Sequence, residues 1–290
     1  MSIHTKIPAR FFYAQPFHNQ GITGKNITIA VLDSGLAPHP DIHPSRILAF
    51  EDFTNPSSNI SRKNLPYDDF SHGTHVTGII ASSKIGIAPE CQLVSLKVLD
   101  KHGTGSSVQF IEALKWLVIH HETYNIRIVN ISVGGSQNDL KESGTSLNRW
   151  INKLWENGLI ICCSAGNNGP KPNSITAPGN CKKVITVGSS DGTHYSSAGP
   201  LLPFITKPEL VAPGTHIIST KPGGGYSIKS GTSMSVPFIS GACALLLQCK
   251  PYLTNDQIKI RLMEASHTVP YLPYNTQGAG ILSLNRLLQN

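Results

Sequence analysis

Apolar runs alternate with helical patterns along most of the chain. Runs rich in β-branched residues predict buried strands, and segments with apolar residues at helical spacing predict helices. The predicted strands are 27–32, 92–99, 127–133, 159–164, 184–188 and 208–211, and the predicted helices are 72–82, 107–122, 146–157, 232–249 and 254–264. This alternation is typical of an α/β protein in three layers, with a mostly parallel central sheet flanked by helices on both faces.

No repeat, low-complexity tract or shift of composition divides the chain, so we expect a single domain over residues 1–290. A chain of this length can bury a substantial core. Residues 1–26 precede the first predicted strand and form either an N-terminal arm or a short pro-segment. The stretches 54–66, 136–145 and 170–180 predict surface loops.

The formal net charge of +7 raises the question of acidic partners such as nucleic acid or a membrane surface. Lysines and arginines are scattered, however, and no basic run is interleaved with aromatic residues. No apolar stretch approaches the length that spans a bilayer. We therefore expect a monomer with a solvated basic surface and with neither nucleic acid nor membrane as a partner.

Two features bear on the compartment. Residues 1–10 have neither the charged n-region nor the apolar h-region of a secretory leader, which favours the cytoplasm. Four of the six cysteines lie in apolar strand or helix patterns and predict free buried thiols; they are Cys162, Cys163, Cys243 and Cys249. The alternative is a secreted enzyme whose mature chain was cut from a longer precursor.

The segment 231–237 places Ser233 where a glycine-led turn passes into an apolar helix. The first turn of a helix has free N–H groups and the positive end of the dipole, so an oxyanion beside Ser233 would find donors already aimed at it. Taken alone, a Gly-Thr-Ser before a helix is more often only an N-cap.

An acid and an imidazole occur in settings that suit activation of a serine. Asp33 follows the predicted strand 27–32, at the sheet edge where α/β proteins bind ligands, although an aspartate there can equally be a turn residue. His72 opens a helix of small residues, and Gly73 lets another backbone come near. His72 and His75 resemble a metal pair, but no third ligand is apparent, so a zinc site is disfavoured.

The order Asp33, His72, Ser233, each within an extended motif, resembles the subtilisin-like serine proteases. Four further segments carry the resemblance: 86–89, 131–135, 164–169 and 211–214. The resemblance implies that Ser233 is the nucleophile, His72 the general base and then acid, and Asp33 the group that holds the imidazole tautomer. It also implies that Asn167 and the Ser233 N–H form the oxyanion hole.

The family binds an extended polypeptide as an added strand between two backbone walls, and the resemblance implies the same substrate here. In this sequence 132–135 resembles one wall and 101–105 the facing strand. Thr176 falls at the floor of the primary pocket, where many relatives have glycine, so the pocket favours medium-sized apolar side chains. The residues assigned to the cleft are Gly103, Thr104, Gly105, Ser132, Val133, Gly134, Gly135, Gly166 and Thr176.

Two departures from the family pattern concern calcium and maturation. Many bacterial subtilisins bind calcium with a longer loop before the segment 86–89 and an aspartate matching Asp41. Here only residues 82–85 intervene, and Lys84 would repel a cation, so we expect no cofactor and no calcium at Asp41. A weaker cation site elsewhere stays open, as does a separate or removed inhibitory pro-segment.

The main alternative to an active endopeptidase is a catalytically silent relative that binds peptides or signals. The intact set of Asp33, His72, Ser233 and Asn167 argues against it. A cysteine enzyme that uses Cys162 or Cys163 is rejected, because neither has a histidine motif arranged for it.

Overall fold

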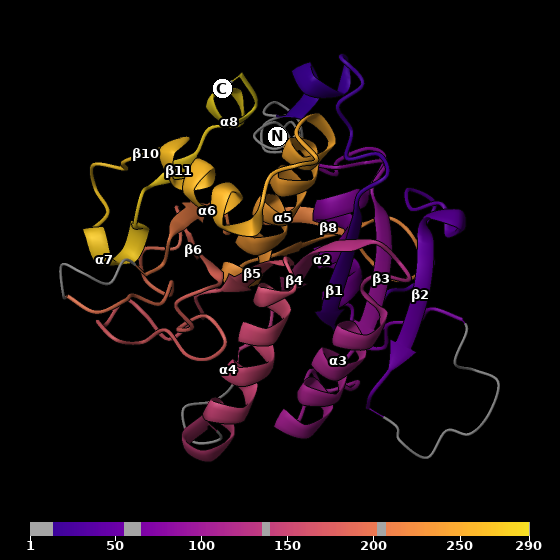
Figure 1. Cartoon of the computed structure of the whole chain (residues 1–290), viewed down its shortest axis with the longest axis horizontal. Coiled ribbons are helices and arrows are strands. Elements are labelled where there is room, and N and C mark those ends of the chain that lie inside the picture. The colour runs from indigo at the N-terminus through magenta and orange to yellow at the C-terminus, as the bar shows by residue number, and fades with distance from the viewer. Residues whose placement is uncertain (1–13, 55–64, 135–139, 202–206, 290) are drawn as a thin grey trace, which may run out of the picture.

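The computed structural model describes residues 14–54, 65–134, 140–201 and 207–289, with no side chains described for 140–146. Its centre is a nine-stranded sheet in the order β10-β11-β7-β6-β5-β4-β1-β3-β2 (Figure 1). Every neighbouring pair is parallel except β10 and β11. The strands are β1 (Thr28–Asp33), β2 (Ile47–Asp52), β3 (Gln92–Lys97), β4 (Ile126–Ile131), β5 (Ile160–Ser164), β6 (Ile185–Ser189), β7 (Leu210–Ala212), β10 (Ser266–His267) and β11 (Ile281–Leu282).

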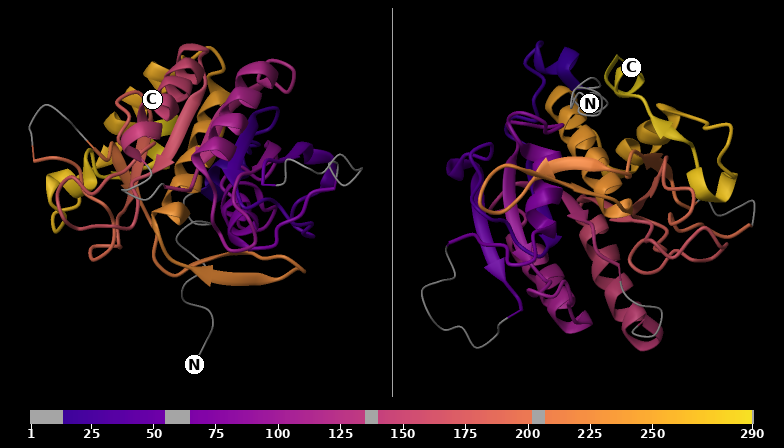
Figure 2. Two further views of the ribbon diagram at one scale, coloured as in Figure 1. Left: turned by 90° about the horizontal axis from the view of Figure 1, so that it is seen from below. Right: turned by 180° about the vertical axis from the view of Figure 1, so that it is seen from behind.

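Helices cover both faces of this sheet (Figures 1 and 2). On one face α5 packs against α2 and crosses β4 to β7, and on the other face α3 packs against α4. The helices are α2 (His72–Ala81), α3 (Ser107–His120), α4 (Leu140–Glu156), α5 (Thr232–Cys249), α6 (Asn255–Glu264), α7 (Tyr274–Gln277), α8 (Leu284–Gln289) and the short 3-10 helix η2 (Pro44–Arg46). The predicted α/β class with a mostly parallel sheet is confirmed.

A separate antiparallel hairpin, β8 (Ile217–Thr220) and β9 (Tyr226–Lys229), lies across α2 (Figure 2). The Ser219 hydroxyl donates to the His75 carbonyl, and the Thr220 hydroxyl donates to the Thr74 carbonyl, both at 2.7 Å. This contact requires glycine in the helix, because a Cβ at Gly78 would lie 2.1 Å from the Thr220 Oγ1. The chain leaves β9 and enters α5 directly.

The topology fixes where a site can form. All six residues of β1 are buried, and β1 lies between β3 and β4. The chain continues from β1 to β2 and β3 on one side, then from β4 to β5 and β6 on the other. The sheet order therefore reverses between β1 and β4, and a crevice opens outside the carboxyl ends of these two strands. Asp33 ends β1 there, and Ser132 directly follows β4.

Two of the loop predictions need correction. Residues 136–145 do not form a loop throughout, since α4 begins at Leu140. Residues 170–180 contain no helix or strand, but 174–179 are buried and so do not form a surface loop. Most of the predicted loop 54–66 lies outside the described residues. Strands β2, β8 and β9 were missed: β2 and β9 are mostly half buried or exposed, and β8, although largely buried, is only four residues long.

Helix α5 and its last residue correct two further expectations. Contrary to the sequence analysis, α5 is long and apolar enough to cross a membrane, yet most of it is buried inside the fold, as expected for a core helix. All six cysteines are free, and five of them are buried. Cys249 is exposed, because α5 ends there, so the prediction of a buried thiol is wrong at this position.

Candidate active site

Asp33 and His72 meet at the end of β1. The His72 Nδ1 lies 2.7 Å from the Asp33 Oδ1, which also accepts the Ser34 N–H at 2.7 Å. Only 1% of Asp33 is exposed. The approach of α2 to the end of β1 depends on Gly73, since a Cβ there would lie 2.1 Å from the Gly35 carbonyl oxygen. The sequence argument for glycine at 73 is therefore confirmed.

The electrostatic setting of His72 is governed by two opposing effects. Burial lowers the imidazole pKa. The charge of Asp33 and its hydrogen bond raise it by more than burial lowers it, so the net pKa is above the ordinary value. Because an ionised carboxylate only accepts, His72 Nδ1 carries the shared proton, and Nε2 holds the lone pair in the neutral ring. Within the described part of the chain, no hydrogen bond is made to Nε2. His72 is thus a strong base with one nitrogen available.

Ser233 is the second residue of α5, after Gly231, whose φ of 145° suits glycine. Its hydroxyl donates to the Ser132 carbonyl oxygen at 2.7 Å, and the Ser132 hydroxyl donates to the Ser233 carbonyl at 3.0 Å. No hydrogen bond joins Ser233 to His72 among the residues that the structure describes. Of the three expected catalytic side chains, Asp33 and His72 are therefore hydrogen-bonded to each other. The Ser233 hydroxyl instead points to the Ser132 carbonyl.

Asn167 lies beside the start of α5. Its Oδ1 accepts the Thr232 N–H at 3.0 Å and the Thr232 hydroxyl at 3.2 Å. These bonds fix the orientation of the amide and leave the Nδ2 donors available. A Cβ at Gly231 would lie 3.1 Å from Nδ2, which is a tight contact, and the positive φ would strain any other residue, so this turn favours glycine. Together with the first-turn N–H of Ser233, the amide can stabilise an anion.

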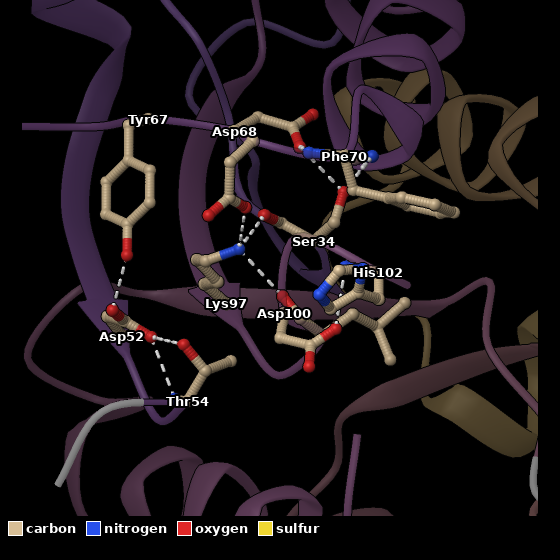
Figure 3. A network of polar contacts seen from close by, with 12 residues as sticks. Ser34, Asp52, Thr54, Tyr67, Asp68, Phe70, Lys97, Asp100 and His102 are labelled. Atoms are coloured by element: carbon tan, nitrogen blue, oxygen red, sulfur yellow. Dashed lines mark hydrogen bonds and ion pairs between the residues drawn. The ribbon is translucent and has the colours of Figure 1, made fainter. Parts of the chain in front are cut away.

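Asp68, which the sequence analysis missed, holds the N-terminus of α2 (Figure 3). Its Oδ1 accepts the Ser34 hydroxyl and the Ser71 N–H, both at 2.8 Å. Its Oδ2 accepts the Thr74 N–H at 2.8 Å and the Thr74 hydroxyl at 2.7 Å. The Ser34 hydroxyl in turn accepts the Gly73 N–H at 2.9 Å. An acidic residue a few positions before a helix is a capping signal that could have been found.

Lys97 is a second residue that the sequence analysis did not single out. Its side chain is 1% exposed, and Nζ donates to the Ser34 carbonyl at 2.7 Å, the Leu99 carbonyl at 2.7 Å and the Asp69 Oδ1 at 2.6 Å (Figure 3). Lys97 lies opposite Asp33 in the β1–β3 register. It therefore ties the turn after β1 to the end of β3, a role that no local pattern indicates.

A chain of polar groups fixes the backbone around Ser233. The Ser240 hydroxyl donates to the Asn130 Oδ1, and the Asn130 Nδ2 donates to the Ser132 hydroxyl, both at 2.9 Å. The Ser132 hydroxyl then donates to the Ser233 carbonyl. All three of these partner residues are buried. The start of α5 is thereby locked to the end of β4.

The two predicted walls of the substrate cleft meet at one pocket of about 270 Å³. Its lining residues are Val98, Leu99, Gly103, Thr104, Gly105, Ser106, Ser107, Phe110, Val133, Gly134, Leu147, Ala177 and Pro178. The facing segment is a turn rather than the predicted strand, since the N–H groups of His102 and Thr104 both donate to the Asp100 Oδ1. Gly135 lies outside the described residues.

Thr176 lies close to two of the glycines that the sequence analysis assigned to the cleft. Its Oγ1 is 3.6 Å from the position of a Cβ at Gly134 and 4.0 Å from that of a Cβ at Gly166. Only 9% of Thr176 is exposed. The structure therefore brings Thr176, Gly134 and Gly166 together, next to the residues 177 and 178 that line the pocket.

Asp41, which matches the calcium ligand of many relatives, has its carboxylate occupied by protein groups. Its Oδ2 accepts the Tyr226 hydroxyl at 2.6 Å and the Ser82 hydroxyl at 3.0 Å, and its Oδ1 lies 3.4 Å from the Lys84 Nζ. Burial and the bond to Asp41 raise the pKa of Tyr226 to about 12. The His75 Nε2 is hydrogen-bonded to the Ile217 carbonyl, which suits a structural role.

Comparisons with known proteins agree with this arrangement. Residues 24–282 match a family model described as the subtilase family. The chain is 35% identical to serine protease AprX of Bacillus subtilis (strain 168) over 92% of this chain and 67% of that protein. It is 33% identical to the subtilisin of Bacillus pumilus over 95% of this chain and 96% of that protein. A crystal structure of a cold adapted subtilisin-like serine proteinase superimposes with a TM-score of 0.76 and 27% identity, with 90% of each chain covered.

Proposed function

Because this chain belongs to the subtilase family of serine endopeptidases, we propose that Asp33, His72 and Ser233 form its catalytic triad. The Ser233 Oγ attacks the scissile carbonyl carbon while the His72 Nε2 accepts the hydroxyl proton. Asp33 holds the Nδ1–H tautomer and stabilises the imidazolium. His72 then gives the proton to the leaving amine, and a water activated by the same nitrogen hydrolyses the acyl-enzyme. The 2.7 Å bond between Asp33 and His72 is the observation that carries this proposal.

The serine hydroxyl must leave the Ser132 carbonyl for this reaction. Rotation about its Cα–Cβ bond redirects Oγ, and catalytic hydrogen bonds often align only when substrate is bound. The oxyanion then faces the Asn167 Nδ2 and the Ser233 N–H. The Thr232 bonds to the Asn167 Oδ1 support this assignment, because they preorganise the amide before charge develops.

The substrate is an extended polypeptide whose acyl side lies between the 103–105 and 132–134 segments. The glycines leave room for a peptide backbone, and the pocket between the walls is mostly apolar. Thr176 closes the primary pocket between Gly134 and Gly166, so medium-sized apolar side chains fit the cleaved residue better than large aromatic ones.

A serine-directed fluorophosphonate tests this function against the silent-relative alternative. The native protein should be labelled once, at Ser233, and Ser233→Ala should abolish the label. Ser230→Ala, an exposed serine three residues earlier, is the matched control and should label normally. A folded native protein that stays unlabelled and cleaves no peptide would favour the silent relative.

The enzyme needs no calcium at Asp41 in this proposal. The carboxylate already bonds Tyr226 and Ser82, and the Lys84 ammonium neutralises its charge. A chelator should therefore leave the thermal unfolding midpoint unchanged. A drop of several degrees that added calcium reverses would identify a cation site.

The protein acts as a monomer in the cytoplasm in this proposal. Six free cysteines support a reducing compartment, because the described chain forms no disulfide. Cell fractionation tests this assignment, and recovery of the protein outside the cell would favour a secreted mature enzyme instead. Sizing by light scattering tests the monomer.

A further inference from the structure

Lys229 is a cation that contacts the residue before His72 and forms no ion pair within the part of the chain that the structure describes. It ends β9, four residues before Ser233, and its partly buried Nζ donates to the Ser71 hydroxyl at 3.1 Å. Ser71 directly precedes His72. Among the residues whose side chains the structure describes, no carboxylate lies within 4.0 Å of this ammonium. A partly desolvated charge without a partner attracts any carboxylate that comes near it.

The neighbours of His72 show on which side of the reaction this cation lies. The Phe70 ring stands over Gly103, since a Cβ at 103 would lie 2.3 Å from it, and Gly103 belongs to the acyl-side wall. The next residue, Ser71, turns its hydroxyl to β9 instead. The Phe70 side chain therefore faces the acyl-side wall, whereas the side chain of Ser71, next to His72 in the chain, faces Lys229.

We propose that Lys229 is a specificity-determining residue that favours substrates with a carboxylate one or two residues after the scissile bond. This inference rests on the proposed function, in which His72 protonates the leaving amine, so the departing segment passes beside the imidazole toward β9. The carboxylate belongs either to an aspartate or glutamate side chain or to the free end of a short departing segment. A lysine or arginine at the same place is disfavoured by repulsion.

The effect of Lys229 on the His72 pKa supports a role for this lysine near the reaction centre. The Lys229 charge opposes that of Asp33 and lowers the His72 pKa. A substrate carboxylate next to Lys229 reduces this unfavourable interaction with the imidazolium that forms in the transition state. Because the substrate carboxylate stabilises the transition state, the preference for it should appear in kcat/KM.

The experiment compares matched peptides with one acyl-side sequence and amidated ends. Glutamate, glutamine or lysine occupies the first or second position after the scissile bond, and one further peptide ends there as a free acid. The native enzyme should cleave the glutamate peptides roughly three- to tenfold faster in kcat/KM than the glutamine ones at low salt, with the difference shrinking as salt is added. A gain confined to the free-acid peptide would identify a terminal carboxylate as the ligand.

The variant Lys229→Met should lose this preference while it still cleaves the glutamine peptide. The variant Lys221→Met removes an exposed cation from the same hairpin and should keep the preference. Equal rates for glutamate and glutamine in the native enzyme, or a preference that survives in Lys229→Met, would overturn the inference. Absence of all cleavage together with absence of the fluorophosphonate label would instead refute the proposed function and this inference with it.

Discussion

Removal of the Asp68 carboxylate should destabilise the fold strongly. In Asp68→Ala five donors lose their acceptor: the N–H groups of Phe70, Ser71 and Thr74 and the hydroxyls of Ser34 and Thr74. Asp68 is only 8% exposed, so water replaces these bonds poorly. A hydrogen bond to a charged group is worth about 1.5–3 kcal/mol, and losses within one network do not add. We expect the free energy of unfolding to fall by about 3–5 kcal/mol, more than the loss of one such bond and less than the sum of five.

Urea unfolding measures this loss, and the Ser233→Ala background keeps the protein from digesting its own unfolded chain. The matched variant Asp68→Asn retains one acceptor oxygen and should lose less than Asp68→Ala. A loss below about 1 kcal/mol for Asp68→Ala, at an unchanged denaturant slope, would refute the argument that this carboxylate holds the start of α2.

Three further predictions concern activity. Asn167→Ala should lower kcat by about 10²–10³, the magnitude measured in subtilisin itself, with KM nearly unchanged; a change in KM alone would contradict the oxyanion role. Activity should fall as pH drops through the raised His72 pKa, because the base must be neutral. Asp33→Asn should move this acid limb of the kcat/KM profile to lower pH. An unmoved limb would count against the role assigned to Asp33. Thr176→Gly should raise kcat/KM for phenylalanine relative to valine at the cleaved residue by about tenfold in a peptide library, and an unchanged ratio would place Thr176 outside the pocket.

The sequence was sufficient to place the main strands and helices around the site. Residues 27–32 form a run of apolar and β-branched residues, so the end of β1 at Asp33 was predictable from local pattern alone. The motif around Gly73 likewise indicated a close backbone approach, which the structure shows. The pattern of apolar and polar residues indicates which side chains are buried. The position of β1 and the close packing at Gly73 both follow from burial, so the sequence could predict them.

The hydrogen-bond partners were not predictable in the same way. Lys97 belongs to an apolar strand pattern, and two of its three acceptors, on Ser34 and Asp69, come from separate segments that only the folded chain brings together. The orientation of the Ser233 hydroxyl depends on one side-chain torsion and on the nearby Ser132 carbonyl. The 101–105 segment was expected to be a strand only from the family resemblance, whereas bonds to the Asp100 carboxylate fold it into a turn.

The hairpin of β8 and β9 fastens two halves of the reaction centre that are remote in the chain. It grips the helix that begins with His72, and its second strand runs straight on to the residue that carries the nucleophile. A displacement of this hairpin would move both the His72 imidazole and the Ser233 hydroxyl. The hairpin is thus one of several contacts that hold the imidazole and the hydroxyl near each other, and its loosening would weaken catalysis while the central sheet stays folded.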